Sequence, residues 1–66
     1  MTIYGKKHYG NAATMRQYEY LKSFENVTFI GRFTKSQWFK YFSTIQISKA
    51  ITAAKNGEDV IIDNSK

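Results

Sequence analysis

The sequence predicts a mainly α fold, a compact domain of three short helices with room for a short two- or three-stranded β element (α+β). Two observations support this prediction. A Thr/Ser-x-x-Gln pattern occurs three times, each time ahead of apolar residues at helical spacing, at Thr14–Gln17, Thr34–Gln37 and Ser43–Gln46. Residues 27–33 are instead β-branched and aromatic, as in a short strand, and residues 60–62 are the candidate to pair with them. Helices should therefore outnumber strands.

The repeated pattern has the form of a capping box. In such a box the hydroxyl of the first residue accepts a hydrogen bond from a backbone N–H, and the glutamine side chain returns a bond to the first residue. Each box is therefore predicted to open a helix. Ahead of the first box, residues 1–13 are expected to form a basic N-terminal arm, and residues 14–66 a single small helical domain. Thr2–Tyr4 has the composition of a short edge strand, but two glycines, Gly5 and Gly10, make the rest of the arm mainly loop.

The first and third helices each have one apolar side. The helix that follows Thr14 gathers its apolar residues on one side and should end near Glu25, because Asn26 can stop it. The helix at about 44–55 ends at Asn56–Gly57, a typical C-terminal stop. Its apolar side is lined by small and branched residues, namely Ile47, Ala50, Ile51 and Ala54.

The second helix, at about 35–42, holds a wide aromatic band. The band consists of Trp38, Phe39, Tyr41 and Phe42 and covers nearly half the circumference of the helix. The core of a small domain needs a narrower apolar band than this, so Trp38 and Tyr41 are either core or interface residues. Between the helices, Val27–Ile30 is expected to form a short strand, and Val60–Ile62 is its natural pairing partner.

Size and composition narrow the class of protein. A chain of 66 residues forms one domain and buries only about 60% of the surface of its unfolded chain. Without cysteine and with one histidine, neither disulfides nor zinc can reinforce the core, so a homodimer or a binding partner becomes more plausible. No apolar run is long enough for a membrane span or signal peptide, which leads us to expect a cytoplasmic protein with no membrane partner.

Charge points to a polyanionic partner. The formal net charge is +5, and residues 1–57 hold nine Lys and Arg against two acids. Lysines neutralise phosphates and aromatic rings stack on unpaired bases. The residues expected to bind nucleic acid or a partner protein are Lys6, Lys7, Arg16, Arg32, Lys35, Trp38, Lys40 and Tyr41. Buried aromatics surrounded by solvated lysines are the competing interpretation.

Four short motifs resemble a known group of proteins. They are Thr14–Gln17 followed by Tyr20-Leu21, Thr34-Lys35, Ser48–Ile51 and Gly57–Val60. Together they resemble small helical domains of phage and prophage proteins, in which a Thr-x-x-Gln-x-x-Tyr-Leu helix precedes a Ser/Thr-Lys-x-Glu-Ala-Ser helix. This chain departs from the pattern at Gln46–Ser48, which stands at the Glu-Ala-Ser step. The resemblance implies a mobile genetic element in a bacterial host, where short proteins often act as inhibitors or adaptors, and it transfers no site residues.

Catalysis is not expected. The chain has no cysteine nucleophile, and its one histidine, His8, lies in the arm without a recognisable acid partner. No cofactor and no metal are expected either, because one histidine and a short acidic tail make an incomplete ligand set. We expect a non-catalytic phage-type protein that acts on a nucleic-acid-handling system by binding nucleic acid or a nucleoprotein complex. The alternative is a protein-binding inhibitor of a host nuclease or defence complex, of the anti-CRISPR or anti-restriction type.

Overall fold

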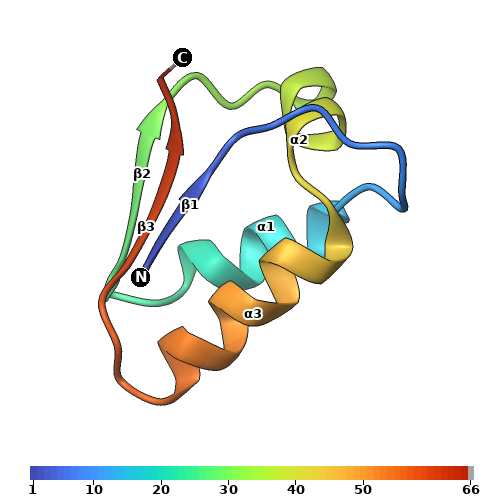
Figure 1. The fold of residues 1–66 in the computed structure, drawn as a ribbon. Coiled ribbons are helices and arrows are strands. Elements are labelled where there is room, and N and C mark those ends of the chain that lie inside the picture. The colour runs from blue at the N-terminus through green and yellow to red at the C-terminus, as the bar shows by residue number, and fades with distance from the viewer. Residues whose placement is uncertain (66) are drawn as a thin grey trace.

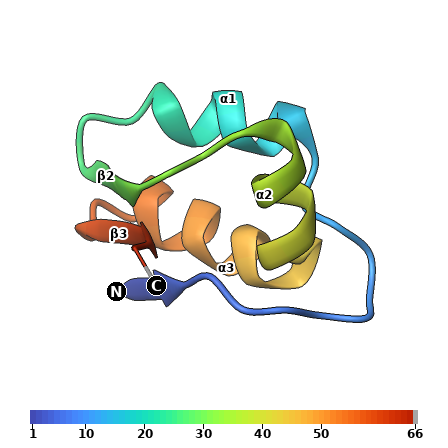
Figure 2. The same ribbon diagram turned by 90° about the horizontal axis from the view of Figure 1, so that it is seen from above.

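The computed structural model describes residues 1–65 and combines a sheet with helices. Its elements in chain order are β1 (Thr2–Tyr4), α1 (Met15–Lys22), β2 (Val27–Gly31), α2 (Lys35–Tyr41), α3 (Thr44–Lys55) and β3 (Val60–Asn64). The helices gather on one side of the sheet (Figures 1 and 2). The prediction of a mainly α fold is therefore wrong, because the described residues form an α+β domain around a three-stranded, fully parallel sheet.

The strand order of the sheet is β1-β3-β2, with the last strand in the centre. The predicted pairing of residues 27–30 with 60–62 is confirmed, with Val27 opposite Val60. On the other side of β3, Ile3 lies opposite Ile62. The first residues of the expected arm thus belong to the sheet. Sequence pattern alone underestimated β1 because three residues give almost no alternation, and their partner lies at the far end of the chain.

All three capping boxes are confirmed. In each, the Thr or Ser hydroxyl accepts from the backbone N–H of the glutamine, whose side chain accepts from the cap N–H. The box at Thr14 also joins two helices, because Gln17 donates from its amide to Thr44 O at 3.4 Å and Ser48 Oγ at 3.3 Å. α1 ends at Lys22, three residues earlier than expected, because Ser23 forms the C-cap and donates from its hydroxyl to Tyr20 O.

The core lies between the helices and one face of the sheet. Its largest fully buried side chains are Trp38, Phe42, Leu21, Ile47, Ile62 and Val60. The Trp38 ring stacks on Phe42 at 5.0 Å and meets Tyr18 edge-on at 5.0 Å. The Trp38 indole N–H donates to Thr14 O at 2.9 Å, so the only polar atom of that side chain is satisfied. Half of the predicted aromatic band thus fills the core of this domain.

β2 ends at Gly31, whose backbone lies close to that of β3. Gly31 has φ +99°, a conformation that side chains strongly disfavour. A Cβ at this position would lie 2.6 Å from the backbone C and O of Asn64. Only glycine fits both the dihedral angle and the space. None of the helices among residues 1–65 has the length and apolar composition that crossing a membrane requires.

Candidate functional site

The two edges of the sheet at which the strands begin and end differ in charge. Because the strands run in one direction, the residues that come after them meet at the same edge, where ligands bind in many open α/β sheets. Lys6 and Lys7 follow β1, and Arg32 follows β2. The helix ends and loops at the opposite edge hold both signs of charge, with Lys22, Glu25, Lys55, Glu58 and Asp59. The carboxyl-end edge is therefore the more basic one.

The chain after β1 runs against the end of α2. Gly5 N–H donates to Asp63 O at 2.8 Å, and Lys6 N–H donates to Tyr41 O at 2.8 Å. The His8 Nε2 atom lies 3.0 Å from Phe39 O. Since a carbonyl oxygen only accepts, this nitrogen carries the proton. The first contact continues the pairing of β1 with β3, and the other two hold the Lys6–His8 segment beside the last turn of α2.

α2 adds two further cations to the same edge. Lys35 occupies its first position, and the Lys40 ammonium lies 5.6 Å from the centroid of the Tyr41 ring. Arg32 is fixed through its backbone, because Asn64 Nδ2 donates to Arg32 O at 2.8 Å. We call the resulting surface the basic edge, which consists of the exposed residues Lys6, Lys7, Arg32, Lys35 and Lys40.

The structure separates the remaining sequence candidates. Tyr41 is half-buried beside Lys40 and belongs to the basic edge. Trp38 is 1% exposed, so its indole cannot reach a base or a partner protein while the domain is folded. Arg16 lies on α1 and lines a separate depression of about 320 Å³ together with Gln17, Tyr20 and Ile51. Six of the eight candidates thus lie at one edge, whereas Trp38 and Arg16 lie apart from it.

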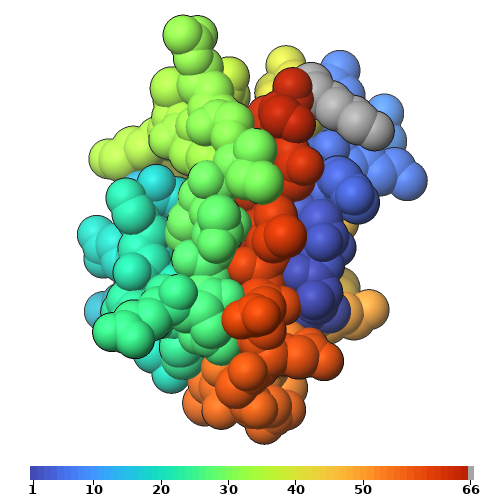
Figure 3. Space-filling model, turned by 90° about the vertical axis from the view of Figure 1, so that its left-hand side faces the viewer, coloured from blue at the N-terminus to red at the C-terminus, as the bar shows by residue number. Residues whose placement is uncertain are grey.

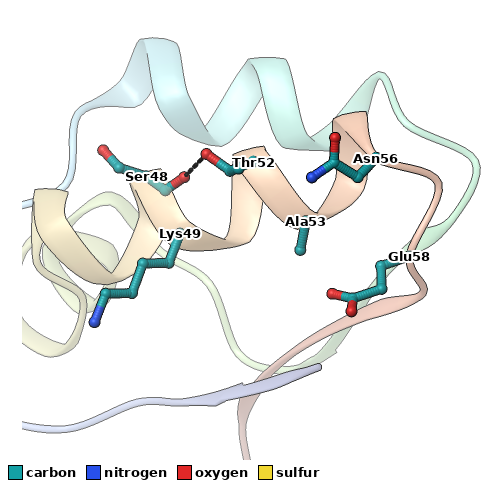
Figure 4. Close-up of a pocket in the computed structure, with 6 residues that line it drawn as sticks. All are labelled: Ser48, Lys49, Thr52, Ala53, Asn56 and Glu58. Carbon is teal, nitrogen blue, oxygen red and sulfur yellow. Dashed lines mark hydrogen bonds between the residues drawn. The ribbon is translucent and has the colours of Figure 1, made fainter.

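A second depression, of about 410 Å³, lies along α3. It is lined by Ser48, Lys49, Thr52, Ala53, Asn56 and Glu58 (Figure 4). Figure 4 shows Lys49 and Glu58 at its two ends, and Thr52 Oγ1 donates to Ser48 O at 3.0 Å. No nucleophile paired with a base lies among these six residues, so this depression offers no recognisable catalytic arrangement.

Sequence reasoning missed one surface, the face of the sheet opposite the helices. We call it the open face, which consists of Thr2, Tyr4, Thr28, Ile30, Ile61 and Asp63. Figure 3 looks onto it and shows β2 (green), β3 (red to orange) and β1 (blue) side by side at the surface. The signal available in the sequence was one aliphatic residue, Ile3, between Thr2 and Tyr4, and it spans only three positions.

The described residues bring together few side chains that could bind a metal ion. Among residues 1–65 no group of three His, Cys, Asp or Glu side chains is placed to hold an ion. Asp63 is separated from Glu58 and Asp59 by the length of β3, and its Oδ1 accepts from the backbone and hydroxyl of Ser65.

Comparison with protein-family models, curated proteins and solved structures found no match to this chain.

Proposed function

We propose that this protein binds nucleic acid through the basic edge and does so without catalysis. The observation that supports the proposal is the gathering of five exposed cations from three separate segments at one edge of the sheet. Bound phosphates release the counterions condensed on a nucleic acid, which favours association with such a surface. A phage-type role at a nucleic-acid-handling system is consistent with this contact.

The first prediction concerns salt and charge. A labelled mixed-sequence oligonucleotide should bind with an affinity that falls steeply from low to moderate salt in fluorescence anisotropy. The double variant Lys6→Gln, Arg32→Gln should bind several-fold more weakly. It should also lower the slope of log affinity against log salt by about 1 for each phosphate that the variant can no longer neutralise.

The matched control is Lys49→Gln, Lys55→Gln on α3. This pair removes the same net charge from the protein, away from the basic edge. It should change the affinity much less than the first pair. Equal losses for the two pairs would mean that net charge, not the basic edge, controls binding. An affinity that does not respond to salt would rule out the proposal.

The protein-binding alternative was predicted from the aromatic band. In the structure Trp38 and Phe42 are buried, and Phe39, at 39% exposure, is the band residue that faces solvent most. The band therefore offers a partner protein little surface. Inhibition of a host nuclease or defence complex by protein contact stays a prediction, and a complex with a host protein that survives nuclease treatment would favour it over nucleic-acid binding.

A further inference from the structure

We infer that the open face receives the unpaired bases of a single-stranded nucleic acid whose phosphates lie along the basic edge. This inference rests on the proposed function and specifies its ligand class. It begins with an unusual feature of the sheet. Parallel sheets are normally covered on both faces, because their connections place helices there. Here all three helices lie on one side, and Tyr4 and Ile30 on the other side are 55% and 41% exposed.

The register arranges the open face in two rows. Tyr4, Asp63 and Ile30 lie opposite one another at the carboxyl end of the strands, and the other row is Thr2, Ile61 and Thr28. The first row directly precedes the basic edge, since Tyr4 is two residues from Lys6 and Ile30 is two residues from Arg32. An aromatic ring thus lies next to the cations, which is the combination that single-strand-binding surfaces use.

The charges on the open face favour a single strand over a duplex. A duplex keeps the faces of its bases stacked and exposes only base edges and phosphates, so it has no free base face to lay on Tyr4. The six residues of the open face include no cation, so phosphates crossing it would find no positive partner among them. A single strand can instead keep its phosphates at Lys6, Lys7 and Arg32 and turn its bases inward onto Tyr4 and Ile30.

The size of the open face argues against a second copy of this chain as its occupant. Three strands spaced at about 4.8 Å, with at most five residues at about 3.3 Å each, give a face of roughly 14 by 17 Å. Each partner of a stable dimer buries about 800 Å². The open face is much smaller than that, whereas it is large enough for two or three bases.

The test compares a labelled single strand with the blunt duplex of the same sequence, using Tyr4 variants. The native protein should bind the single strand more tightly. Tyr4→Ala should weaken single-strand binding by roughly 5- to 150-fold, the range found when an aromatic stacking partner is removed. Duplex binding should change little. Tyr4→Phe should retain most of the affinity, because a phenyl ring still stacks.

Tyr20→Ala is the matched control, since Tyr20 is 44% exposed but lies on α1, away from the open face. Circular dichroism of each variant shows whether it is folded. As a direct measurement on the unaltered protein, ultraviolet crosslinking to an iododeoxyuridine-substituted strand followed by mass spectrometry should identify Tyr4 as a crosslinked residue.

The outcomes separate this inference from the proposed function. Equal affinity for single strand and duplex, with no effect of Tyr4→Ala, would overturn the inference and leave binding at the basic edge intact. Absence of any nucleic-acid binding would overturn both. A dimer in analytical ultracentrifugation that Tyr4→Ala dissociates, with no change in single-strand affinity, would assign the open face to a second copy and also overturn the inference.

Discussion

At the scale of single residues, Trp38 shows how one side chain can organise a small core. It packs on Phe42 and Tyr18 and donates to the carbonyl of Thr14, the residue that caps α1. One side chain therefore connects α2 with the start of α1. Its burial also removes it from any role in stacking on a ligand, so the exposed Tyr4 replaces it as the aromatic residue of interest.

Trp38→Ala should destabilise the protein by a large part of its total stability. Removing a large buried aromatic side chain costs about 3–5 kcal/mol, whereas a chain of this length has a total stability of roughly 3–10 kcal/mol. Urea denaturation followed by far-ultraviolet circular dichroism measures the loss. Phe39→Ala, one residue further along α2, is the control and should lose much less, because Phe39 is 39% exposed. Equal losses for the two variants would contradict the assignment of Trp38 to the core.

At the scale of elements, all three helices could be predicted from the sequence, but of the sheet only the pairing of residues 27–30 with 60–62. A capping box is complete within four residues, so Thr14, Thr34 and Ser43 identified the three helix starts correctly. β1 depends on a partner 59 positions away, since Ile3 pairs with Ile62. No local pattern records such a contact. Strand direction was equally hidden, because the alternation of side chains is the same in parallel and antiparallel strands.

The end of β2 provides a test of the sheet itself. Gly31→Ala should destabilise the protein by about 1–3 kcal/mol through the backbone conformation alone, and further because the new Cβ would lie 2.6 Å from Asn64 backbone atoms. Thermal unfolding measures the effect. Gly10→Ala is the control, since nothing lies within 4 Å of its Cβ position. If both variants melt at the same temperature, the placement of Gly31 close to the backbone of β3 is contradicted.

At the scale of the whole molecule, the candidate site depends on the direction of the strands. Lys6 and Arg32 are 26 positions apart in the sequence, and both were predicted to bind from charge and residue type alone. Their common location results from the parallel arrangement of β1 and β2, which places both strand ends at one edge. The open face could not be predicted either, because the sequence does not show that all the helices pack on one side of the sheet.

Because β3 is the central strand, the stability of the fold should depend strongly on the C-terminal residues 60–64. A chain ending at Asp59 lacks the strand that pairs with both β1 and β2, so it should lose the sheet and the cooperative thermal transition. A chain ending at Asn64 retains all of β3 and should unfold near the native temperature. Far-ultraviolet circular dichroism of the two truncated proteins checks this. A cooperative transition in the shorter protein would contradict the strand order.

The same strand order has a consequence for biosynthesis. A ribosome releases β1 and β2 before β3, and neither of the first two strands has a neighbour until β3 appears between them. The apolar residues Ile3, Val27 and Phe29 therefore stay unpaired during this part of translation, when nascent chains are prone to aggregation. The sheet can form only after β3 has left the ribosome, and the length of chain between β2 and β3 sets that delay.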